Sequence, residues 1–287
     1  MKIALGTVQF GMKYGVANTG SRVGSAEVQE ILGAARAAGI DTLDTAAAYG
    51  NSEQVLGQIG VDSFNIVSKV PPQTENTAGS SDWILRSVEQ SLINLKTDCL
   101  YGLLLHRPLE LLHANGGEMY KTLLSLKEQG LVEKIGASIY GPSDLDKLAE
   151  NFDFDIVQAP MNILDRRLES TGWLNKLSNC GTEIHIRSAF LQGLLLMPLD
   201  QRPDYFKPWQ ALLADFDAWV EGNNCSPIQA CLSYLNQYPE ITRIVVGVET
   251  EEQLWGVISA MNSPRAFVPE NLQTNDLNLI NPACWKL

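Results

Sequence analysis

Residues 41–50 of the chain read DTLDTAAAYG, a short apolar strand that ends at Asp44, followed by a loop that carries Tyr49. Taken alone, an aspartate in front of a loop is more often a cap or a turn former than a catalytic residue. The stretch gains meaning because the next two apolar segments end in Lys69 and His106. The carboxyl ends of parallel strands face one mouth of a barrel, so these residues are placed to converge.

The rest of the sequence alternates between strand-like and helix-like segments. Apolar runs of strand length occupy residues 3–6, 42–44, 65–69, 99–105, 132–138, 155–159, 183–188 and 243–248. Helical periodicity occupies residues 26–39, 54–59, 82–95, 118–129, 142–149, 172–178, two segments within 206–236, and 251–261. The candidate N-caps of the first three helices are Ser25, Asn51 or Ser52, and Asp82. Eight strand–helix units in roughly 250 residues predict an α/β fold, a closed (β/α)8 TIM barrel.

A doubly wound parallel sheet is the alternative architecture for alternating strands and helices. It is disfavoured because no GxGxxG fingerprint follows a strand. No Gly/Ser linker divides the chain, which predicts a single domain over residues 1–287 with a tail at 263–287. Trp285, near an otherwise polar end, suggests that this tail folds near the pocket. No β-hairpin precedes the first strand, so other residues are expected to close the bottom of the barrel.

The composition limits the partners that are expected. The 287 residues are 45% hydrophobic, which is ordinary for a globular protein with a sizeable core, and the formal net charge is −12. A chain this acidic is not expected to bind nucleic acid or an anionic membrane surface. No stretch has the character of a signal peptide or a membrane span, so a soluble, cytoplasmic protein is expected. The oligomeric state stays open.

The five cysteines do not form a recognisable framework. They are Cys99, Cys180, Cys225, Cys231 and Cys284, and no two of them form a CxxC pair. An odd number without paired spacing predicts reduced thiols, and no His/Cys spacing predicts a metal site.

Asp44, Tyr49, Lys69 and His106 together form a set that can protonate an oxygen atom. A phenol has a pKa of about 10, so at neutral pH it is a proton donor, although a reluctant one. The ammonium group of Lys69 would lower that pKa, and Asp44 would hold Lys69 through a charge-assisted hydrogen bond. A neutral His106 would orient a carbonyl oxygen toward Tyr49.

The same set lacks a nucleophile of its own. No Ser or Cys sits beside a plausible histidine at a strand end, so a hydride from a bound cofactor fits best. A hydrolase with paired carboxylates would need a second acid facing Asp44, and no strand end offers a convincing one. Structural roles are the alternative for each residue: Lys69 as a solvated strand end, His106 as a satisfied histidine, Tyr49 as a cover for the barrel edge. It is less common for four such residues to share one end of the barrel by coincidence than for one residue to do so.

The runs LGTVQFG, GIDTLDTAAAYGNSE, LLLHRP and KIGAS, with Lys69 at the end of the third strand, resemble the aldo-keto reductase superfamily. The resemblance covers nearly the whole chain. It implies a (β/α)8 barrel that binds NADPH in an extended form and reduces aldehydes, ketones or sugar carbonyls. It also implies that Tyr49 is the general acid, that Lys69 and Asp44 tune it, and that His106 orients the substrate.

The resemblance extends to the cofactor site. Ser138 and Gln158 match residues that hold the nicotinamide carboxamide, whereas Ile139 departs from the family's Asn or Arg. Arg187 takes the place of an aromatic residue that stacks on the nicotinamide, and its charge would disfavour the oxidised, cationic ring. The implied cofactor contacts are Gly6, Thr7, Asp44, Ser138, Gln158, Arg187, Ser188, Phe190, Gln192, Gly193, Gly247, Glu249 and Gln253. The implied substrate contacts are Gln9, Tyr49, His106 and Asn162.

The segment after the last strand departs most from the family. Where the family offers Lys or Arg to the 2′-phosphate of NADPH, this chain has an acidic run that includes Glu249 and Glu252. A carboxylate beside the ribose favours a free 2′-hydroxyl, and so NAD, unless these acids only occupy the first turn of a helix. Arg243 or Arg265 could still reach a 2′-phosphate. The family-wide habit favours NADP (NADPH), with NAD as the alternative.

The expected function is therefore that of an NAD(P)H-dependent oxidoreductase acting on a small-molecule carbonyl or sugar. The alternative from another class is a cofactor-binding redox sensor or regulatory subunit with little turnover. The intact catalytic set argues against the sensor, whereas Arg187 and Ile139 leave it open. The substrate stays undetermined: aromatic residues would make the pocket apolar, and Arg107 or Arg187 would instead bind an anionic or sugar-nucleotide substrate.

Overall fold

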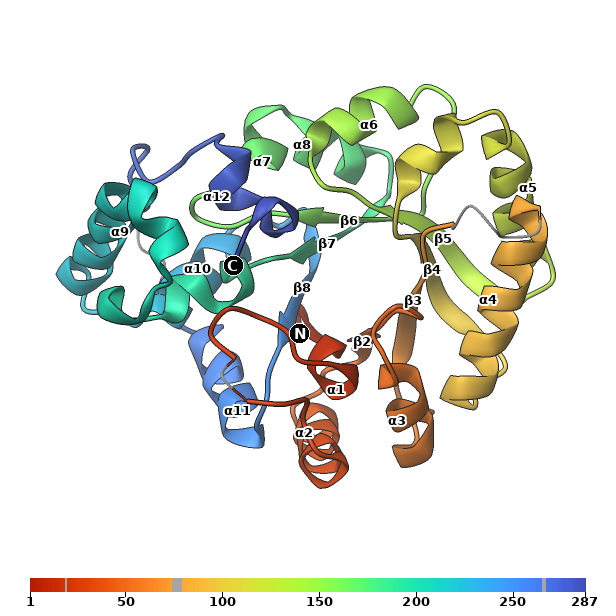
Figure 1. Cartoon of the computed structure of the whole chain (residues 1–287), viewed down its shortest axis with the longest axis horizontal. Coiled ribbons are helices and arrows are strands. Elements are labelled where there is room, and N and C mark those ends of the chain that lie inside the picture. Colours follow the sequence, from red (N-terminus) through yellow and green to blue (C-terminus); the bar gives the residue numbers. More distant parts are fainter. Residues whose placement is uncertain (19, 74–78, 265–266) are drawn as a thin grey trace.

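The computed structural model describes residues 1–18, 20–73, 79–264 and 267–287. Eight parallel strands pair in chain order and the first also pairs with the last, which closes the sheet into a barrel (Figure 1). The strands are β1 Ile3–Gly6, β2 Thr42–Asp44, β3 Asn65–Val70, β4 Leu100–Leu105, β5 Val132–Ser138, β6 Ile156–Pro160, β7 Glu183–Arg187 and β8 Ile241–Gly247. The predicted (β/α)8 TIM barrel is confirmed, and each strand lies within two residues of its predicted bounds.

Helices surround the barrel (Figure 1). The longer ones are α2 Ser25–Ala37, α3 Ser52–Ile59, α4 Ser80–Leu95, α5 Gly116–Glu128, α6 Pro142–Leu148, α8 Trp173–Asn179, α9 Gln210–Gly222, α10 Pro227–Asn236 and α11 Glu251–Ala260. Shorter elements are α1 Val8–Gly11, α7 Arg167–Ser170, α12 Leu277–Ile280, η1 Pro108–Leu112, η2 Leu191–Leu196, η3 Leu199–Gln201, η4 Asp204–Trp209 and η5 Pro282–Cys284. Two predicted N-caps are wrong, because Gly24 and Gly79 occupy those positions in α2 and α4. Asn51 precedes α3 without a capping side-chain bond.

The strand register brings the predicted site residues to one mouth of the barrel. All eight pairings are parallel, with Gly6 opposite Asp44 and Ser138 opposite Gln158. A small apolar cluster fills the barrel beneath this mouth, and its members are Val67, Leu104 and Ile156. The polar residues at the strand ends therefore stand on an apolar floor that separates them from the other end of the barrel.

Charged and polar side chains of β4, β5 and β7 form a hydrogen-bonded network toward that other end. Lys134 pairs with Glu183 and also donates to the Tyr101 hydroxyl at 2.7 Å. The Tyr101 hydroxyl donates to Glu183 Oε1 at 2.7 Å, and His185 Nε2 lies 3.2 Å from Glu183 Oε2. Burial acts to raise the pKa of Glu183, but hydrogen bonds from His185, Lys134 and Tyr101 lower it to about 2. That other residues close the bottom of the barrel in place of a β-hairpin stays a prediction.

The tail after α11 packs beside the loop between β6 and α7. The Trp285 ring meets Phe206 of η4 edge to face, with centroids 4.9 Å apart. Arg166, in the β6–α7 loop, donates to the Pro269 carbonyl at 2.8 Å. No described residue of the tail lines the main cavity at the barrel mouth. An effect of the tail on substrate binding stays a prediction, to be tested by truncation after Asn281.

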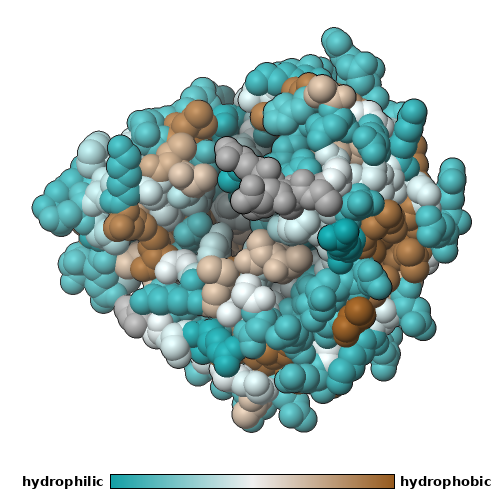
Figure 2. Space-filling view, turned by 45° about the vertical axis from the view of Figure 1, so that its right-hand side comes forward, coloured by the Kyte–Doolittle hydropathy of each residue, from teal (hydrophilic) through white to brown (hydrophobic). Residues whose placement is uncertain are grey.

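The face shown in Figure 2 is mostly hydrophilic, and its apolar side chains lie in separate patches. Among residues 1–18, 20–73, 79–264 and 267–287, no helix combines the length and the apolar character needed to cross a membrane. The same residues contain no group of three or more His, Cys, Asp or Glu side chains arranged to hold a metal ion.

Candidate active site

Lys69 and Asp44 form a buried ion pair at the mouth of the barrel. Lys69 Nζ lies 2.8 Å from each carboxylate oxygen of Asp44 and donates a further bond of 2.9 Å to the Thr45 carbonyl. The side chains of Lys69 and Asp44 are only 1% and 6% exposed. All three ammonium donors have acceptors, which is the condition for holding such a charge away from water.

A chain of hydrogen bonds extends from this pair across the mouth. Gln158 Nε2 donates to Asp44 Oδ1 at 2.6 Å, and Ser138 Oγ donates to Gln158 Oε1 at 3.2 Å. Asp44 ends β2, Ser138 ends β5 and Gln158 lies within β6, so the closure of the barrel brings the three strands' side chains together. The pair predicted to hold a carboxamide is therefore bonded directly to the predicted catalytic pair.

Tyr49 lies close to the ion pair, with His106 beside it. Lys69 Nζ is 5.1 Å from the centre of the Tyr49 ring, and the Tyr49 and His106 rings meet edge to face at 6.1 Å. Burial raises the pKa of Tyr49, the charge of Asp44 raises it further, and Arg187 opposes the rise. The expectation that Lys69 lowers this pKa is wrong, because Asp44 neutralises Lys69 and leaves burial dominant. The phenol is therefore protonated at neutral pH and is a proton donor.

The two basic groups beside Tyr49 have lowered pKa values. Burial lowers the pKa of Lys69, and the charge and hydrogen bonds of Asp44 oppose the change. Burial is also the main cause that lowers the pKa of His106 to about 4, with help from Lys69 and Arg187. His106 is therefore neutral at physiological pH. Its Nδ1 is buried and has no hydrogen-bond partner among the described residues.

Two glycines fix the loop that carries Tyr49. A Cβ atom at Gly11 would lie 1.7 Å from the Tyr49 carbonyl oxygen, so only glycine lets α1 approach this loop. Gly50 has a φ of +58°, and a Cβ atom there would lie 2.5 Å from the Gly11 carbonyl oxygen. Ser52 Oγ donates to the Thr7 carbonyl at 2.9 Å and so ties the start of α3 to the end of β1. Ser52 is the first residue of α3 and serves as a tether. Of the two predicted N-caps, Asn51 therefore occupies the N-cap position and Ser52 does not.

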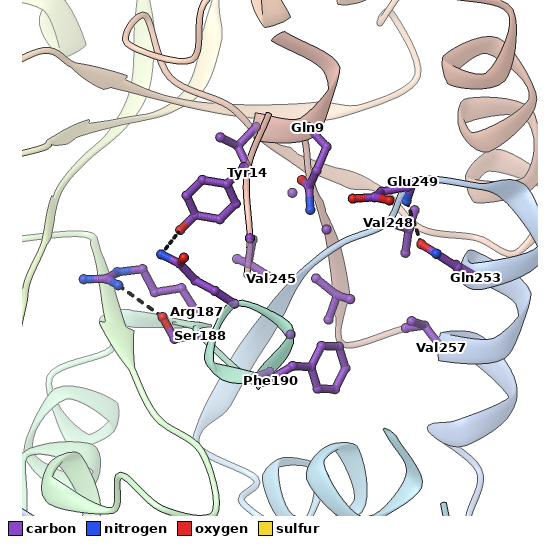
Figure 3. A pocket seen from close by; sticks show the side chains of 18 of the residues that line it. Gln9, Tyr14, Arg187, Ser188, Phe190, Val245, Val248, Glu249, Gln253 and Val257 are labelled. Carbon is purple, nitrogen blue, oxygen red and sulfur yellow. Dashed lines mark hydrogen bonds between the residues drawn. The ribbon is translucent and has the colours of Figure 1, made fainter. Parts of the chain in front are cut away.

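A cavity of about 410 Å³ opens beside these residues. Figure 3 shows Tyr14 and Arg187 at one end of it and Glu249 and Gln253 at the other, with Phe190 between them. Most of the predicted site residues line the cavity: Gly6, Thr7, Gln9, Asp44, Tyr49, Gln158, Arg187, Ser188, Phe190, Gln192, Gly193, Gly247, Glu249 and Gln253. Lys69, His106 and Ser138 lie outside this lining and contact it through Asp44, Tyr49 and Gln158, respectively.

The loop after β7 forms one wall of the cavity and contacts the loop after α1. Ser188, Gln192 and Gly193 all have positive φ, so the loop takes a path that ordinary residues rarely adopt. The Gln192 carbonyl accepts from Val16 N at 3.0 Å, and Gln192 Nε2 donates to the Tyr14 hydroxyl at 3.0 Å. These bonds hold the two loops together along the cavity wall.

Arg187 extends from the end of β7 toward the end of β5. Its Nη2 donates to the Ile139 carbonyl at 2.9 Å and its Nη1 to Ser188 Oγ at 3.3 Å. The guanidinium carbon lies 5.2 Å from the centre of the Tyr140 ring. The Ile139 side chain is fully buried, so its backbone carbonyl, not its side chain, is what it offers to Arg187.

Two predicted substrate contacts, Asn162 and Gln9, have other neighbours in the structure. Asn162 Oδ1 accepts from the backbone N–H groups of Leu164 and Asp165, and its Nδ2 donates to the Ser188 carbonyl at 3.1 Å. These are the contacts of a loop-shaping residue, and Asn162 does not line the cavity. Gln9 lies against Gly247 at the end of β8, toward Glu249 (Figure 3). Contact of either residue with a substrate stays a prediction.

The end of the cavity beyond β8 contains polar groups without partners. Burial raises the pKa of Glu249, which the nearby Asn18 side chain opposes. Asn18 Nδ2 and Gln9 Oε1 are buried, and neither has a hydrogen-bond partner among the described residues. Asn18 was not singled out from the sequence, because a lone Asn in a Gly-rich loop carries no signal of its own.

Of the two arginines proposed for a 2′-phosphate, only Arg243 is among the described residues, and it does not lie at this end of the cavity. Arg243 lies near the start of β8, at the bottom of the barrel, where its Nη2 pairs with Asp41 at 3.1 Å. The prediction that Arg243 could reach the phosphate is therefore wrong. Arg265 lies outside the described residues.

Known proteins resemble this chain in sequence. The profile of the Aldo/keto reductase family matches residues 2–274. Oxidoreductase YdhF of Escherichia coli is 30% identical over 194 residues, which cover 61% of this chain and 63% of YdhF. An aldo-keto reductase of Mycobacterium sp. (strain KMS) is 30% identical over 128 residues, 44% of this chain and 45% of that protein. The matched region thus spans less than two thirds of the length of these curated relatives.

Solved structures have the same barrel. PA4992 of Pseudomonas aeruginosa has a TM-score of 0.69 at 25% identity, covering 91% of this chain and 89% of that chain. An aldo-keto reductase of Bacillus halodurans in its holo form has a TM-score of 0.73 over 93% and 88% of the two chains. At 19% identity the latter likeness shows the fold alone. Because the family profile covers nearly the entire sequence, the chain belongs to the aldo/keto reductase family.

Proposed function

We propose that the protein is a nicotinamide-dependent reductase of aldehydes, ketones or sugar carbonyls, with Tyr49 as the general acid. The observation that carries this proposal is the Tyr49 phenol, which lines a cavity and lies beside the buried Lys69–Asp44 pair. Membership of the aldo/keto reductase family supports the same chemistry.

Each of the four catalytic residues has a task that its surroundings support. Tyr49 donates its proton to the carbonyl oxygen as negative charge develops there. Lys69, 5.1 Å from the ring centre, stabilises the phenolate that remains, and Asp44 holds Lys69 through two bonds of 2.8 Å. His106, neutral because its pKa is about 4, orients the carbonyl without competing as an acid.

The cavity residues fit a nicotinamide dinucleotide. Buried polar groups without partners, such as Gln9 Oε1 and Asn18 Nδ2, call for a hydrogen-bonding ligand. Ser138 and Gln158 would hold the carboxamide next to the ion pair, and the backbone of residues 188–193 would hold the pyrophosphate. When bound, the cofactor supplies the hydride for the carbonyl carbon.

We further propose that NADH binds more tightly than NADPH, although the family habit predicts NADP. Of the cavity-lining residues that the structure describes, Arg187 is the only lysine or arginine, and it lies opposite Glu249 (Figure 3). A 2′-phosphate beside Glu249 would therefore meet a like charge with no cation next to it among the described cavity-lining residues. A free 2′-hydroxyl could instead donate to the carboxylate.

Titration of the purified protein with NADH and with NADPH, followed by quenching of tryptophan fluorescence, tests both proposals. We expect NADH to bind about tenfold more tightly, and Glu249→Gln to bring the two affinities closer. Glu252→Gln, at an exposed position in the first turn of α11 and three residues after Glu249, is the matched control and should leave the ratio unchanged.

The outcomes separate the two proposals from each other. Binding of neither cofactor would overturn the reductase function itself. Tighter binding of NADPH would overturn only the preference for NADH. Tight binding of either cofactor with negligible turnover across a panel of aldehydes and ketones would favour the redox sensor.

A further inference from the structure

We propose that Arg187 docks an anionic group of the carbonyl substrate, so that the substrate is an aldehyde or ketone carrying a carboxylate or a phosphate. The inference rests on the proposed function and names its substrate class. A guanidinium group suits this task because its planar, forked donors match the oxygens of carboxylates and phosphates.

Arg187 is the one uncompensated positive charge among the described residues that line the cavity. Lys69 is neutralised by Asp44 at 2.8 Å, and His106 is neutral because its pKa is about 4. Arg187 forms no ion pair with a carboxylate of any described residue. The reaction end of the cavity therefore carries a positive charge in a protein whose formal net charge is −12.

The guanidinium is held in place but keeps donors for a ligand. Of its five N–H groups, one is directed to the Ile139 carbonyl and one to Ser188 Oγ. The Tyr140 ring, 5.2 Å from the guanidinium carbon, supports it from the side. Three donors remain on a half-buried side chain that lines the cavity. Such pre-organisation lowers the cost of binding an anion.

The position of Arg187 suits a substrate whose carbonyl meets Tyr49. Arg187 and Tyr49 line the same cavity. In keeping with this placement, the charge of Arg187 opposes the rise in the pKa of Tyr49 and contributes to the lowered pKa of His106. The opposite end of the cavity carries Glu249 (Figure 3), so an anionic substituent is repelled there and attracted to Arg187.

Matched substrate pairs test the proposal. One pair compares a carboxylate with a neutral analogue of the same shape, 4-formylbenzoate and 4-formylbenzamide. The other compares a phosphate with its absence, glyceraldehyde 3-phosphate and glyceraldehyde. We expect kcat/KM to be about tenfold or more higher for the anionic member of at least one pair. The pair that responds identifies the anion, and 0.5 M salt should reduce its advantage.

Variants assign the selectivity to one arginine. In Arg187→Met the anionic-to-neutral ratio should fall to about one, whatever the absolute rate, and Arg187→Lys should retain part of it. Arg107→Met is the control, since Arg107 is an exposed arginine next to His106, and it should leave the ratio unchanged. Equal kcat/KM values within both pairs for the unmodified protein, or a ratio lost in Arg107→Met instead, would overturn the proposal.

Calorimetric titration with the product alcohols keeps this inference separate from the proposed function. If no aldehyde is reduced, the reductase function fails, but 4-(hydroxymethyl)benzoate should still bind more tightly than 4-(hydroxymethyl)benzamide. Equal affinities for these two alcohols, in a protein that also shows no selectivity in turnover, would overturn the role of Arg187. The comparison is available in the unmodified protein, so it does not depend on the folding of any variant.

Discussion

Two lysine–carboxylate pairs lie at opposite ends of the same eight strands. Lys69–Asp44 lies at the carboxyl end of the barrel, and Lys134–Glu183 lies at its amino end. The side chains of the first pair are 1% and 6% exposed, and those of the second are 30% and 21% exposed. Each pair has a tyrosine over which the lysine lies, Tyr49 at 5.1 Å and Tyr101 at 4.6 Å from the ring centre. The apolar cluster of Val67, Leu104 and Ile156 separates them.

The two tyrosines differ in what their hydroxyl groups do. The Tyr101 hydroxyl bridges its pair, accepting from Lys134 and donating to Glu183 at 2.7 Å each. The Tyr49 hydroxyl makes no hydrogen bond to any described residue, and Tyr49 lines the cavity. A tyrosine beside such a pair is structural when its hydroxyl completes the network, and available for chemistry when its hydroxyl is left for a ligand. The charge pair alone does not mark the site.

Removing each hydroxyl group gives the sharpest test of this difference. Tyr49→Phe should lower turnover of aldehydes by about 10²–10⁴-fold, because the proton donor is lost while the ring remains. Cofactor affinity should change little, as measured by fluorescence titration. Tyr101→Phe is the matched control and should leave turnover within about twofold while costing about 1 kcal/mol of stability. Comparable rates for the two variants would erase the distinction between the ends.

Replacing each lysine tests how much the two pairs depend on their partners. Lys69→Met leaves the Asp44 carboxylate buried and unpaired, so the free energy of unfolding should fall by about 3–5 kcal/mol. Lys134→Met should cost about 1 kcal/mol, because water reaches Glu183 and screens the pair. Urea unfolding at pH 7 measures both. Equal losses would mean that the exposure of the two pairs does not set their contribution.

The carboxyl end could be predicted from the sequence because barrel geometry is regular. Parallel strands all end at one mouth, so Asp44, Lys69, His106 and Ser138 could be placed together from the strand boundaries alone. Their order along the chain sufficed, since every strand pairs with the next.

Contacts that depend on tertiary packing could not be predicted in the same way. Lys134 lies near the start of β5 and Glu183 begins β7, 49 residues later in the chain, and only the closed barrel shows that they meet. The sequence predicts a lowered pKa for Tyr49 because it shows the charge of Lys69 but not the extent of burial. In the folded protein, burial and the charge of Asp44 raise this pKa. Arg243 belongs to the strand that leads to the cofactor site, but it lies near the start of β8, where it pairs with Asp41, and not at the mouth of the barrel.

The two ends of the barrel should also differ in the pH range over which the free energy of unfolding changes. These effects are smaller than those of the substitutions above. His106 has a pKa of about 4 in the folded protein and about 6.5 when unfolded, so the unfolded chain takes up a proton first as the pH falls. The contribution of neutral His106 to the free energy of unfolding is therefore complete above about pH 6.5 and is lost between about pH 6.5 and 4. Glu183 has a pKa of about 2, against about 4.5 when unfolded, so its contribution is lost between about pH 4.5 and 2.

Across each of these two pH ranges the free energy of unfolding should fall by about 1–2 kcal/mol, since His106 and Glu183 are both partly exposed. Urea unfolding at intervals between pH 7 and 3 measures the two slopes. His106→Gln should flatten the slope between pH 6.5 and 4 and leave the more acidic range alone, whereas Glu183→Gln should do the reverse. A single variant that flattens both ranges would mean that the two networks are coupled through the barrel. Independent slopes would mean that the apolar layer isolates the reaction end from the network at the bottom.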